Sequence, residues 1–259
     1  IADYHEGPTR SRAVGVHPAG IYLGQIVGGF AGYAAESSDY GWRWAFSTCG
    51  MLGVVYALPL MALLRNPARP VAESTAPAAP PAGVVSGLLG NANFILLTLY
   101  FTLPAIAGWV VRDWMPDILK ENFGLGLGAA GVSAILFVQI ASLTGAIAGG
   151  TLADRWILRT PRGRIFASAI GVALFMPALF GVGNAGSLAM AICFLVLFGI
   201  GWGFFDCNNM PILCQIVRPE LRATGYGIMN LVSISCGGFA NAAAPSDRAC
   251  PSARRAPHR

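Results

Sequence analysis

The stretch 199–217, GIGWGFFDCNNMPILCQIV, places an acid and two amides in the middle of an apolar run. On a helix, Asp206 and Asn209 share one face because they are three residues apart, and Asn208 lies beside them. Pro211 follows two residues after Asn209 and leaves a backbone carbonyl without its helical partner. A carboxylate with amides at this depth could bind a sugar hydroxyl, a cation or a proton, and the alternative is a buried acid satisfied by another helix.

The stretch 100–119, YFTLPAIAGWVVRDWMPDIL, carries a second candidate set, made of Tyr100, Trp109 and Arg112. Trp109 and Arg112 are three residues apart, and the planar guanidinium could pair with an anionic group of a solute through two hydrogen bonds. The alternative is an ordinary membrane boundary, where aromatic rings and snorkelling charges gather.

Three more amides, Gln25, Gln139 and Asn230, also lie in apolar stretches. Amides in such surroundings hydrogen-bond between helices. We therefore expect them to join neighbouring helices rather than to bind a solute.

The composition requires these residues to lie in a membrane. Hydrophobic residues make up 55% of the chain and charged residues 11%, with a mean hydropathy of +0.59, whereas roughly a quarter of the residues of a soluble domain are charged. A helix needs about 20 apolar residues to cross a bilayer, and strand-like alternation is absent. We predict an all-α, polytopic bundle with spans near 13–35, 43–64, 93–118, 130–153, 165–184, 187–217 and 223–243.

The basic residues gather on one side of these predicted spans. With 154–164 in the cytoplasm, that side collects Arg10, Arg12, Arg65, Arg69, Arg155, Arg159, Arg162, Arg164, Arg218 and Arg222. The opposite loops hold only Arg43 and Lys120, as the positive-inside rule predicts. The last stretch, 244–259, breaks the rule with four arginines and has a low-complexity composition, so we predict a non-native or disordered tail.

The loop 149–164, GGTLADRWILRTPRGR, combines an acid with four arginines. Asp154 ends a predicted helix, where the helix dipole disfavours a negative charge, so it should have a positive partner such as Arg155, Arg12 or the N-terminus of a neighbouring helix. An ion pair at the cytoplasmic rim could hold one conformational state and release another. The alternative is a set of charges that only fixes the orientation in the membrane.

An internal repeat and a linker divide the chain. Arg12 and Arg222 each open an Arg-Ala-x-Gly motif, and Gly-Gly-Phe-Ala follows in both copies, at 28–31 and 237–240. Two motifs in register predict a parallel repeat of six-helix units. Residues 66–91 have the Pro/Ala/Ser/Gly composition of a cytoplasmic linker. We expect 1–65 to end the first unit with two spans and 92–243 to supply five spans of the second.

These features resemble the major facilitator superfamily of secondary transporters. Its cytoplasmic loop signature is similar to Gly150, Leu152, Ala153, Asp154 and Arg155, followed by Arg162, Gly163 and Arg164. A glycine-rich fifth helix (Gly20, Gly24, Gly28, Gly29, Gly32) and the sequence GWRWAF at 41–46 are also similar. The resemblance implies a fold of two times six helices, of which this chain covers helices five to eleven, with helices seven and ten lining a central cavity. We place Arg12 and Arg222 in the same cytoplasmic gate.

The predicted function is alternating-access transport of a small polar solute, such as a sugar, a sugar acid or an organic anion, coupled to a proton or sodium gradient. We expect a multi-pass protein of a bacterial-type inner (plasma) membrane. Its partners are the solute, the coupling ion and lipid, without nucleic acid or an indicated protein partner.

We expect no enzymatic activity, cofactor or metal. The six cysteines form no CxxC pair, and no GxxxxGK[ST] loop occurs. The alternatives are a seven-helix receptor, which a topology reporter located outside at residue 1 would favour, and a membrane-embedded hydrolase.

Overall fold

The computed structural model describes residues 18–63 and 81–243, and every regular element in these ranges is helical. The prediction of an all-α bundle is confirmed. The helices are α2 (Pro18–Gly29), α3 (Ala31–Glu36), α4 (Gly41–Leu63), α5 (Pro81–Leu89), α6 (Ala92–Phe123), α7 (Leu127–Ile157), α8 (Gly163–Gly183), α9 (Leu188–Ile216), the 3₁₀ turn η3 (Pro219–Leu221) and α10 (Arg222–Ala243).

Five of the described helices, α4 and α6 to α9, are long and apolar enough to cross a membrane. The first predicted span differs from the expected single helix, because α2 and α3 are separate helices joined at Phe30. The seventh predicted span is α10, a single helix of 22 residues whose asparagines and serines make it more polar than the others. The predicted linker contains a short helix, α5. Residues 1–17, 64–80 and 244–259, with Arg12 and the predicted tail, lie outside the described residues.

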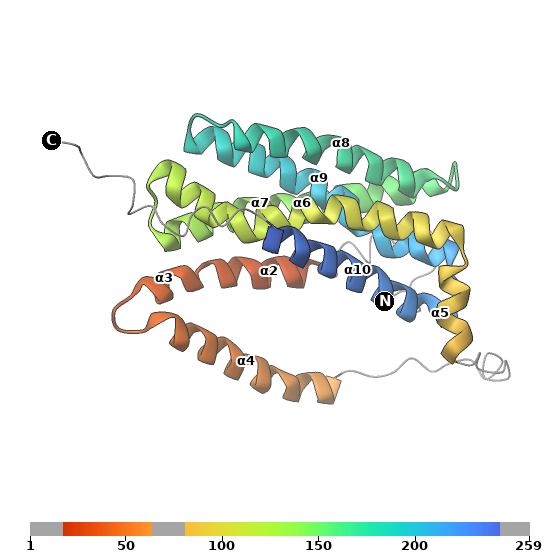
Figure 1. Cartoon of the computed structure of the whole chain (residues 1–259), viewed down its shortest axis with the longest axis horizontal. Coiled ribbons are helices and arrows are strands. Elements are labelled where there is room, and N and C mark those ends of the chain that lie inside the picture. Colours follow the sequence, from red (N-terminus) through yellow and green to blue (C-terminus); the bar gives the residue numbers. More distant parts are fainter. Residues whose placement is uncertain (1–17, 64–80, 244–259) are drawn as a thin grey trace.

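Local signals set where the long helices begin and end. The side chain of Asn91 caps α6 by accepting a hydrogen bond from the backbone N–H of Asn93 at 3.0 Å. Gly124 ends the same helix in the left-handed conformation, with φ 65°. Ser187 caps α9 through the N–H of Met190 at 3.3 Å. Such tight turns make α6 and α7, and likewise α8 and α9, run antiparallel (Figure 1).

Helix α9 packs along both α7 and α8, and glycines allow the close approach. A Cβ atom added at Gly203 would lie 2.2 Å from the carbonyl oxygen of Ser142 in α7. A Cβ added at Gly201 would lie 2.6 Å from the carbonyl oxygen of Gly171 in α8. Small residues at helix interfaces are the usual means of tight packing in membranes, where dispersion contacts replace the hydrophobic effect. The three helices therefore form a fixed core.

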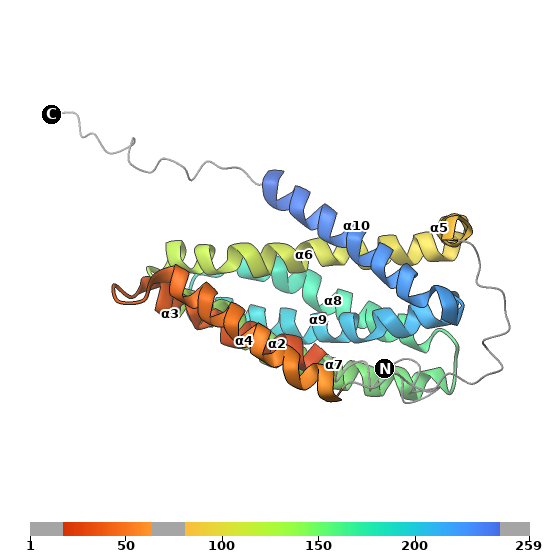
Figure 2. The ribbon, with the colours of Figure 1, turned by 90° about the horizontal axis from the view of Figure 1, so that it is seen from below.

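The segment before residue 64 contacts this core through two short helices. Helices α2 and α3 both lie against α7, whereas α4 diverges from the bundle (Figure 1; Figure 2 shows the turned view). In α4 only Ala45 is buried. The apolar side chains of α4 are thus left facing outward, as expected for a helix in contact with lipid or with further helices.

Replacement of Gly203 by alanine is expected to destabilise the core. The added methyl would overlap the α7 backbone, and overpacking costs about 1–3 kcal/mol. Gly227→Ala is the matched control, because a Cβ at Gly227 meets nothing within 4 Å. The measurement is the midpoint of thermal unfolding in detergent, which should fall for Gly203→Ala and be unchanged or slightly raised for the control. Equal midpoints would show that the α7–α9 contact is not close-packed.

Candidate functional site

A cavity of about 360 Å³ lies between α2 and the helices α6, α7, α9 and α10. Helix α9 supplies one wall through Phe198, Trp202, Asp206 and Met210. Their spacing of four residues keeps them on one face of the helix, while the glycines of α9 face α7 and α8. One helix thus carries both the core contacts and the cavity wall.

Asp206 lies in this wall, where the sequence predicted a functional acid. The hydroxyl of Tyr22 in α2 donates a hydrogen bond to Asp206 Oδ2 at 3.1 Å. Tyr22 is only 4% exposed. A carboxylate is costly inside a membrane and needs a donor, so this bond stabilises the charge and joins α2 to α9 across the cavity. No group of three or more His, Cys, Asp or Glu residues in the described ranges could hold a metal.

A second polar contact joins α2 to α7 beside the cavity. The side-chain amide of Gln139 donates to Oε1 of Gln25, and both residues line the cavity. The prediction that these amides join helices is confirmed. For Asn230 it is wrong, because its amide donates to the carbonyl of Tyr226 in its own helix at 2.9 Å.

Trp109 and Arg112 also line the cavity, from α6. The guanidinium carbon of Arg112 lies 3.7 Å from the centre of the Trp109 ring, in a cation–π contact. Arg112 Nε donates to Asp113 Oδ1 at 3.4 Å, and the amide of Asn241 in α10 donates to Asp113 Oδ2 at 2.6 Å. Trp114 Nε1 donates to Asn241 at 3.0 Å. This network fixes α6 to α10 around the cation.

Three predicted solute ligands lie away from the cavity. Asn208 and Asn209 are 0% and 2% exposed and do not line it. Asn208 donates to the carbonyl of Phe204 at 3.0 Å, and the Tyr100 ring packs 5.5 Å from that of Phe205. We expected Asp206 and Asn209 to share one face of the helix. In the structure the cavity-lining residues of α9 are four apart, so Asn209, three residues after Asp206, lies to the side of the row that faces the cavity.

The arginine-rich loop contains one buried ion pair. Arg164 Nη2 lies 3.7 Å from Asp154 Oδ1, and the two residues are 4% and 8% exposed. Asp154 therefore has the positive partner that the dipole argument requires, in Arg164 rather than Arg155. Gly163 permits the tight turn, because a Cβ there would lie 2.6 Å from the carbonyl carbon of Trp156.

The remaining residues of the predicted gate lie apart from this pair. Arg155 and Arg162 are exposed, and Gly150 is buried in α7. Arg222 begins α10 and donates through Nη2 to the carbonyl of Cys214 at 3.4 Å. The structure thus separates the buried pair from the exposed Arg155 and Arg162 and from the half-buried Arg222.

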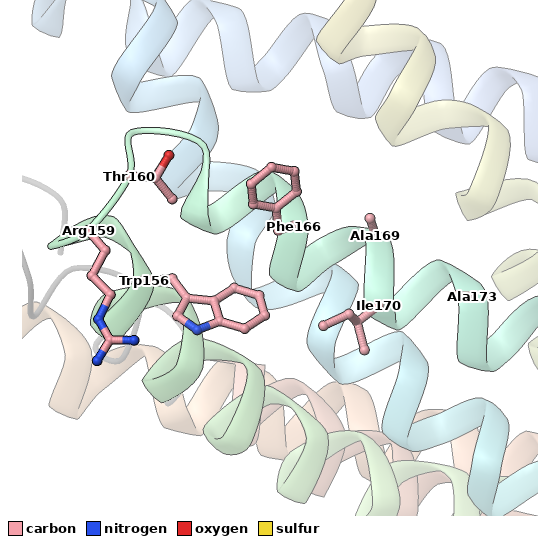
Figure 3. Close-up of a pocket in the computed structure, with 7 residues that line it drawn as sticks. All are labelled: Trp156, Arg159, Thr160, Phe166, Ala169, Ile170 and Ala173. Atoms are coloured by element: carbon pink, nitrogen blue, oxygen red, sulfur yellow. The ribbon is translucent and has the colours of Figure 1, made fainter.

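A wider pocket of about 560 Å³ lies beside this loop, between α7 and α8 (Figure 3). Its walls are mainly apolar, with Trp156, Phe166 and Ile170, and Arg159 and Thr160 are its polar residues. Solute sites combine apolar walls with several convergent polar groups. The cavity at Asp206 has that combination, so we assign the candidate site there.

Glu36, which the sequence analysis did not single out, caps α7 from α3. Its Oε1 accepts from the N–H of Leu127 at 3.2 Å and its Oε2 from the N–H of Gly128 at 3.3 Å. These N–H groups open a helix and have no intrahelical partner, and a carboxylate also complements the dipole there. A Cβ at Gly128 would lie 2.4 Å from the Tyr33 ring, and one at Gly32 would lie 3.2 Å from Gly128 Cα. The two segments are therefore in close contact at this end.

Two sequence signals point to this cap. The residue before α7, Gly126, has no side chain that could cap the helix. Glu36 is an acid at the end of an apolar stretch. Neither signal says that the two ends meet, which only the packing of α3 on α7 determines.

Comparison with known proteins agrees with these features. A family model described as Major Facilitator Superfamily matches residues 1–241. The chain belongs to the Major Facilitator Superfamily. The resemblance seen in the sequence is confirmed, and the chain is an integral, multi-pass membrane protein.

Individual superfamily relatives are distant. The chain is similar to an MFS-type efflux pump of Mycolicibacterium smegmatis, with 28% identity over 83% of this chain and 49% of the relative. It is 26% identical to a citrate-proton symporter of Klebsiella pneumoniae over 78% of this chain and 45% of the relative. It is 24% identical to the protein spinster of Drosophila melanogaster over 85% of this chain and 37% of the relative. The chain thus spans less than half the length of each of these relatives.

Removal of the Glu36 carboxylate is expected to loosen the contact between α3 and α7. A cysteine at Gly29, which is buried near this seam, reports the opening through its labelling by a membrane-impermeant maleimide from the predicted outer side. Loss of a helix cap costs about 0.5–1.5 kcal/mol, so Glu36→Ala should raise the labelling rate roughly two- to tenfold.

Asp39→Ala is the control for this experiment, because the bond near Asp39 is local, from its own N–H to Ser37 Oγ at 3.2 Å. It should leave the labelling rate unchanged. Equal labelling in the Glu36 and Asp39 variants would mean that the cap does not hold the two segments together.

Proposed function

We propose that this chain is part of a secondary transporter that moves a small polar solute, such as a sugar, a sugar acid or an organic anion, by alternating access. A proton or sodium gradient drives the transport. Membership in a superfamily with an efflux pump and a symporter among the relatives supports transport over the receptor and hydrolase alternatives. Residues 1–65 and 92–243 belong to two rocking halves joined by 66–91.

The observation that carries this proposal is the bond between Tyr22 and Asp206. It places an ionisable group of α9 in the cavity wall and ties it to α2, which belongs to the other proposed half. Binding of a proton or a sodium ion to Asp206 changes the charge at this contact. The coupling ion and the relative position of the two halves are thereby linked.

The contact between α2–α3 and α7 supports alternating access. At the Glu36 end, Gly29, Gly32 and Gly131 bring backbones together, and a Cβ at Gly131 would lie 3.2 Å from the Gly29 carbonyl oxygen. Farther along α2, polar side chains make the contact, through the bonds of Gln139 to Gln25 and of Tyr22 to Asp206. The seam is thus close-packed at one end and joined by polar side chains beyond it, and these polar contacts can separate when two halves rock about the packed end.

The buried Asp154–Arg164 pair supports a gate at the predicted cytoplasmic end. A buried pair is costly to separate, because one charge is then left without a partner. Both residues belong to the α7–α8 connection, so the pair fixes this loop at the end of the proposed second half. We propose that the rigid loop, with its exposed arginines, contacts the other half in the state that is closed to the cytoplasm.

Asp206→Asn tests the proposed function. In proteoliposomes containing the full-length protein, an imposed proton or sodium gradient should drive accumulation of at least one of labelled glucose, gluconate, citrate and benzoate. Asp206→Asn should lower that accumulation at least tenfold without reducing membrane insertion, because the amide cannot carry the coupling charge.

Asp117→Asn is the matched control, because Asp117 is an exposed acid on α6 that does not line the cavity. It should transport like the unmodified protein. Wild-type accumulation by Asp206→Asn would remove this residue from the coupling mechanism.

A further inference from the structure

We infer that the solute is an organic anion with an apolar body, held at its anionic group by Arg112 on the Trp109 ring. This inference rests on the proposed function and names the class of solute within it. It excludes sugars and sugar acids as the main solutes. Three features support this inference: the free N–H groups of the Arg112 guanidinium, its fixed position on Trp109 and the apolar wall beside it.

Arg112 is the one cation that lines the cavity among the described residues. Its single hydrogen bond within these residues runs from Nε to Asp113 at 3.4 Å. Asp113 is also the acceptor for Asn241, so its charge is shared. The two terminal nitrogens of the guanidinium have no acceptor in the described part of the chain, and the side chain is 39% exposed. A planar fork with free N–H groups matches the two oxygens of a carboxylate.

The surrounding contacts hold this guanidinium in place. Trp109 packs against α10 so closely that a Cβ at Gly237 would lie 2.7 Å from its ring. Arg112 stacks on that ring, and its Asp113 partner is tied to α10 through Asn241. A cation that is already ordered loses little conformational entropy when a solute binds.

The wall next to Arg112 is aromatic. A Cβ added at Gly108, one turn before Arg112, would lie 2.4 Å from the Trp202 ring, so that ring lies against α6 at this level. Phe198 lines the same cavity and lies next to Trp202, with the two ring centres 6.0 Å apart. A solute bound to Arg112 places its body over these rings. Sugar hydroxyls over these rings would lose hydrogen bonds to water, whereas an apolar body gains contact area.

Asp206 lies well away from this anion position. Gly108 in α6 lies at the level of Trp202 in α9. From that level, Arg112 is four residues farther along α6, and Asp206 is four residues farther along α9, which runs in the opposite direction. Eight residues at 1.5 Å per residue separate the two charges by about 12 Å along the helices. The acid therefore does not occupy the place of the solute's anionic group, and anion binding and ion coupling use different parts of one cavity.

The test measures binding of four probes to the purified full-length protein by quenching of tryptophan fluorescence. Benzoate has the anion and the apolar body, benzyl alcohol lacks the charge, benzylammonium reverses it, and gluconate lacks the apolar body. We expect benzoate to bind at least about tenfold more tightly than the other three, since each lacks one of the two contacts.

Variants assign this selectivity to Arg112. Arg112→Gln should weaken benzoate binding about tenfold or more, and Arg112→Lys should bind with intermediate affinity, because lysine keeps the charge but loses the fork. Lys120→Gln is the control, a cation of the same helix outside the cavity, and should bind benzoate normally. Unchanged benzoate binding by Arg112→Gln would overturn the inference.

Selectivity of the unmodified protein keeps the test decisive even if a variant does not fold. Gluconate or benzyl alcohol binding as tightly as benzoate would contradict the proposed solute class. Selective benzoate binding without gradient-driven uptake of labelled benzoate would leave the inference standing and contradict the transport proposal. Asp206-dependent uptake of glucose or gluconate without benzoate binding would support the transport proposal and contradict the inferred solute class.

Discussion

The close contact of α2 and α3 with α7 is the constraint on which the rest of the site depends. Glycines bring the backbones together near Glu36, and that carboxylate completes the hydrogen bonding of the α7 N-terminus. Farther along, the contact passes to the Gln25–Gln139 pair and then to Tyr22 and Asp206. The seam thus changes from close-packed backbone to polar side chains, and the cavity lies where the polar contacts begin.

Helix α9 makes this arrangement possible because one side of it packs against α7 and α8 and another side lines the cavity. Gly199 and Gly203 fit against α7, and Gly201 fits against α8, so the helix cannot shift without separating the core. The opposite face presents Trp202 and Asp206 to the cavity. An ionisable group on a rigid helix transmits a change of charge to its partner on α2 rather than absorbing it locally. This is the physical basis on which we link ion binding to movement of the proposed halves.

Much of this was predictable from sequence because a bilayer permits few solutions. The long apolar stretches predicted the helices, and an acid at membrane depth predicted that Asp206 has a special place. Helical spacing was a poorer guide to Asn208 and Asn209, since only packing decides which flank of a helix faces a cavity. The cap by Glu36 and the junction at Phe30 depend on which helices meet, and neither leaves a periodic pattern. Arg112 was identified, but its fixed position on Trp109 required the contact of Trp109 with Gly237.

Rocking of the two halves about the seam can be tested by a pair of distance measurements by pulsed electron paramagnetic resonance in membranes. One pair of spin labels, at Asp39 and Asn122, reports the Glu36 end of the seam, and a second pair, at Gly20 and Arg159, reports the opposite end. Rocking about the seam predicts two populations in each pair, whose proportions change reciprocally on acidification or on addition of sodium, so that one end closes as the other opens. Distances that change in the same sense at both ends, or a single unchanging population, would contradict a seam about which two halves rock.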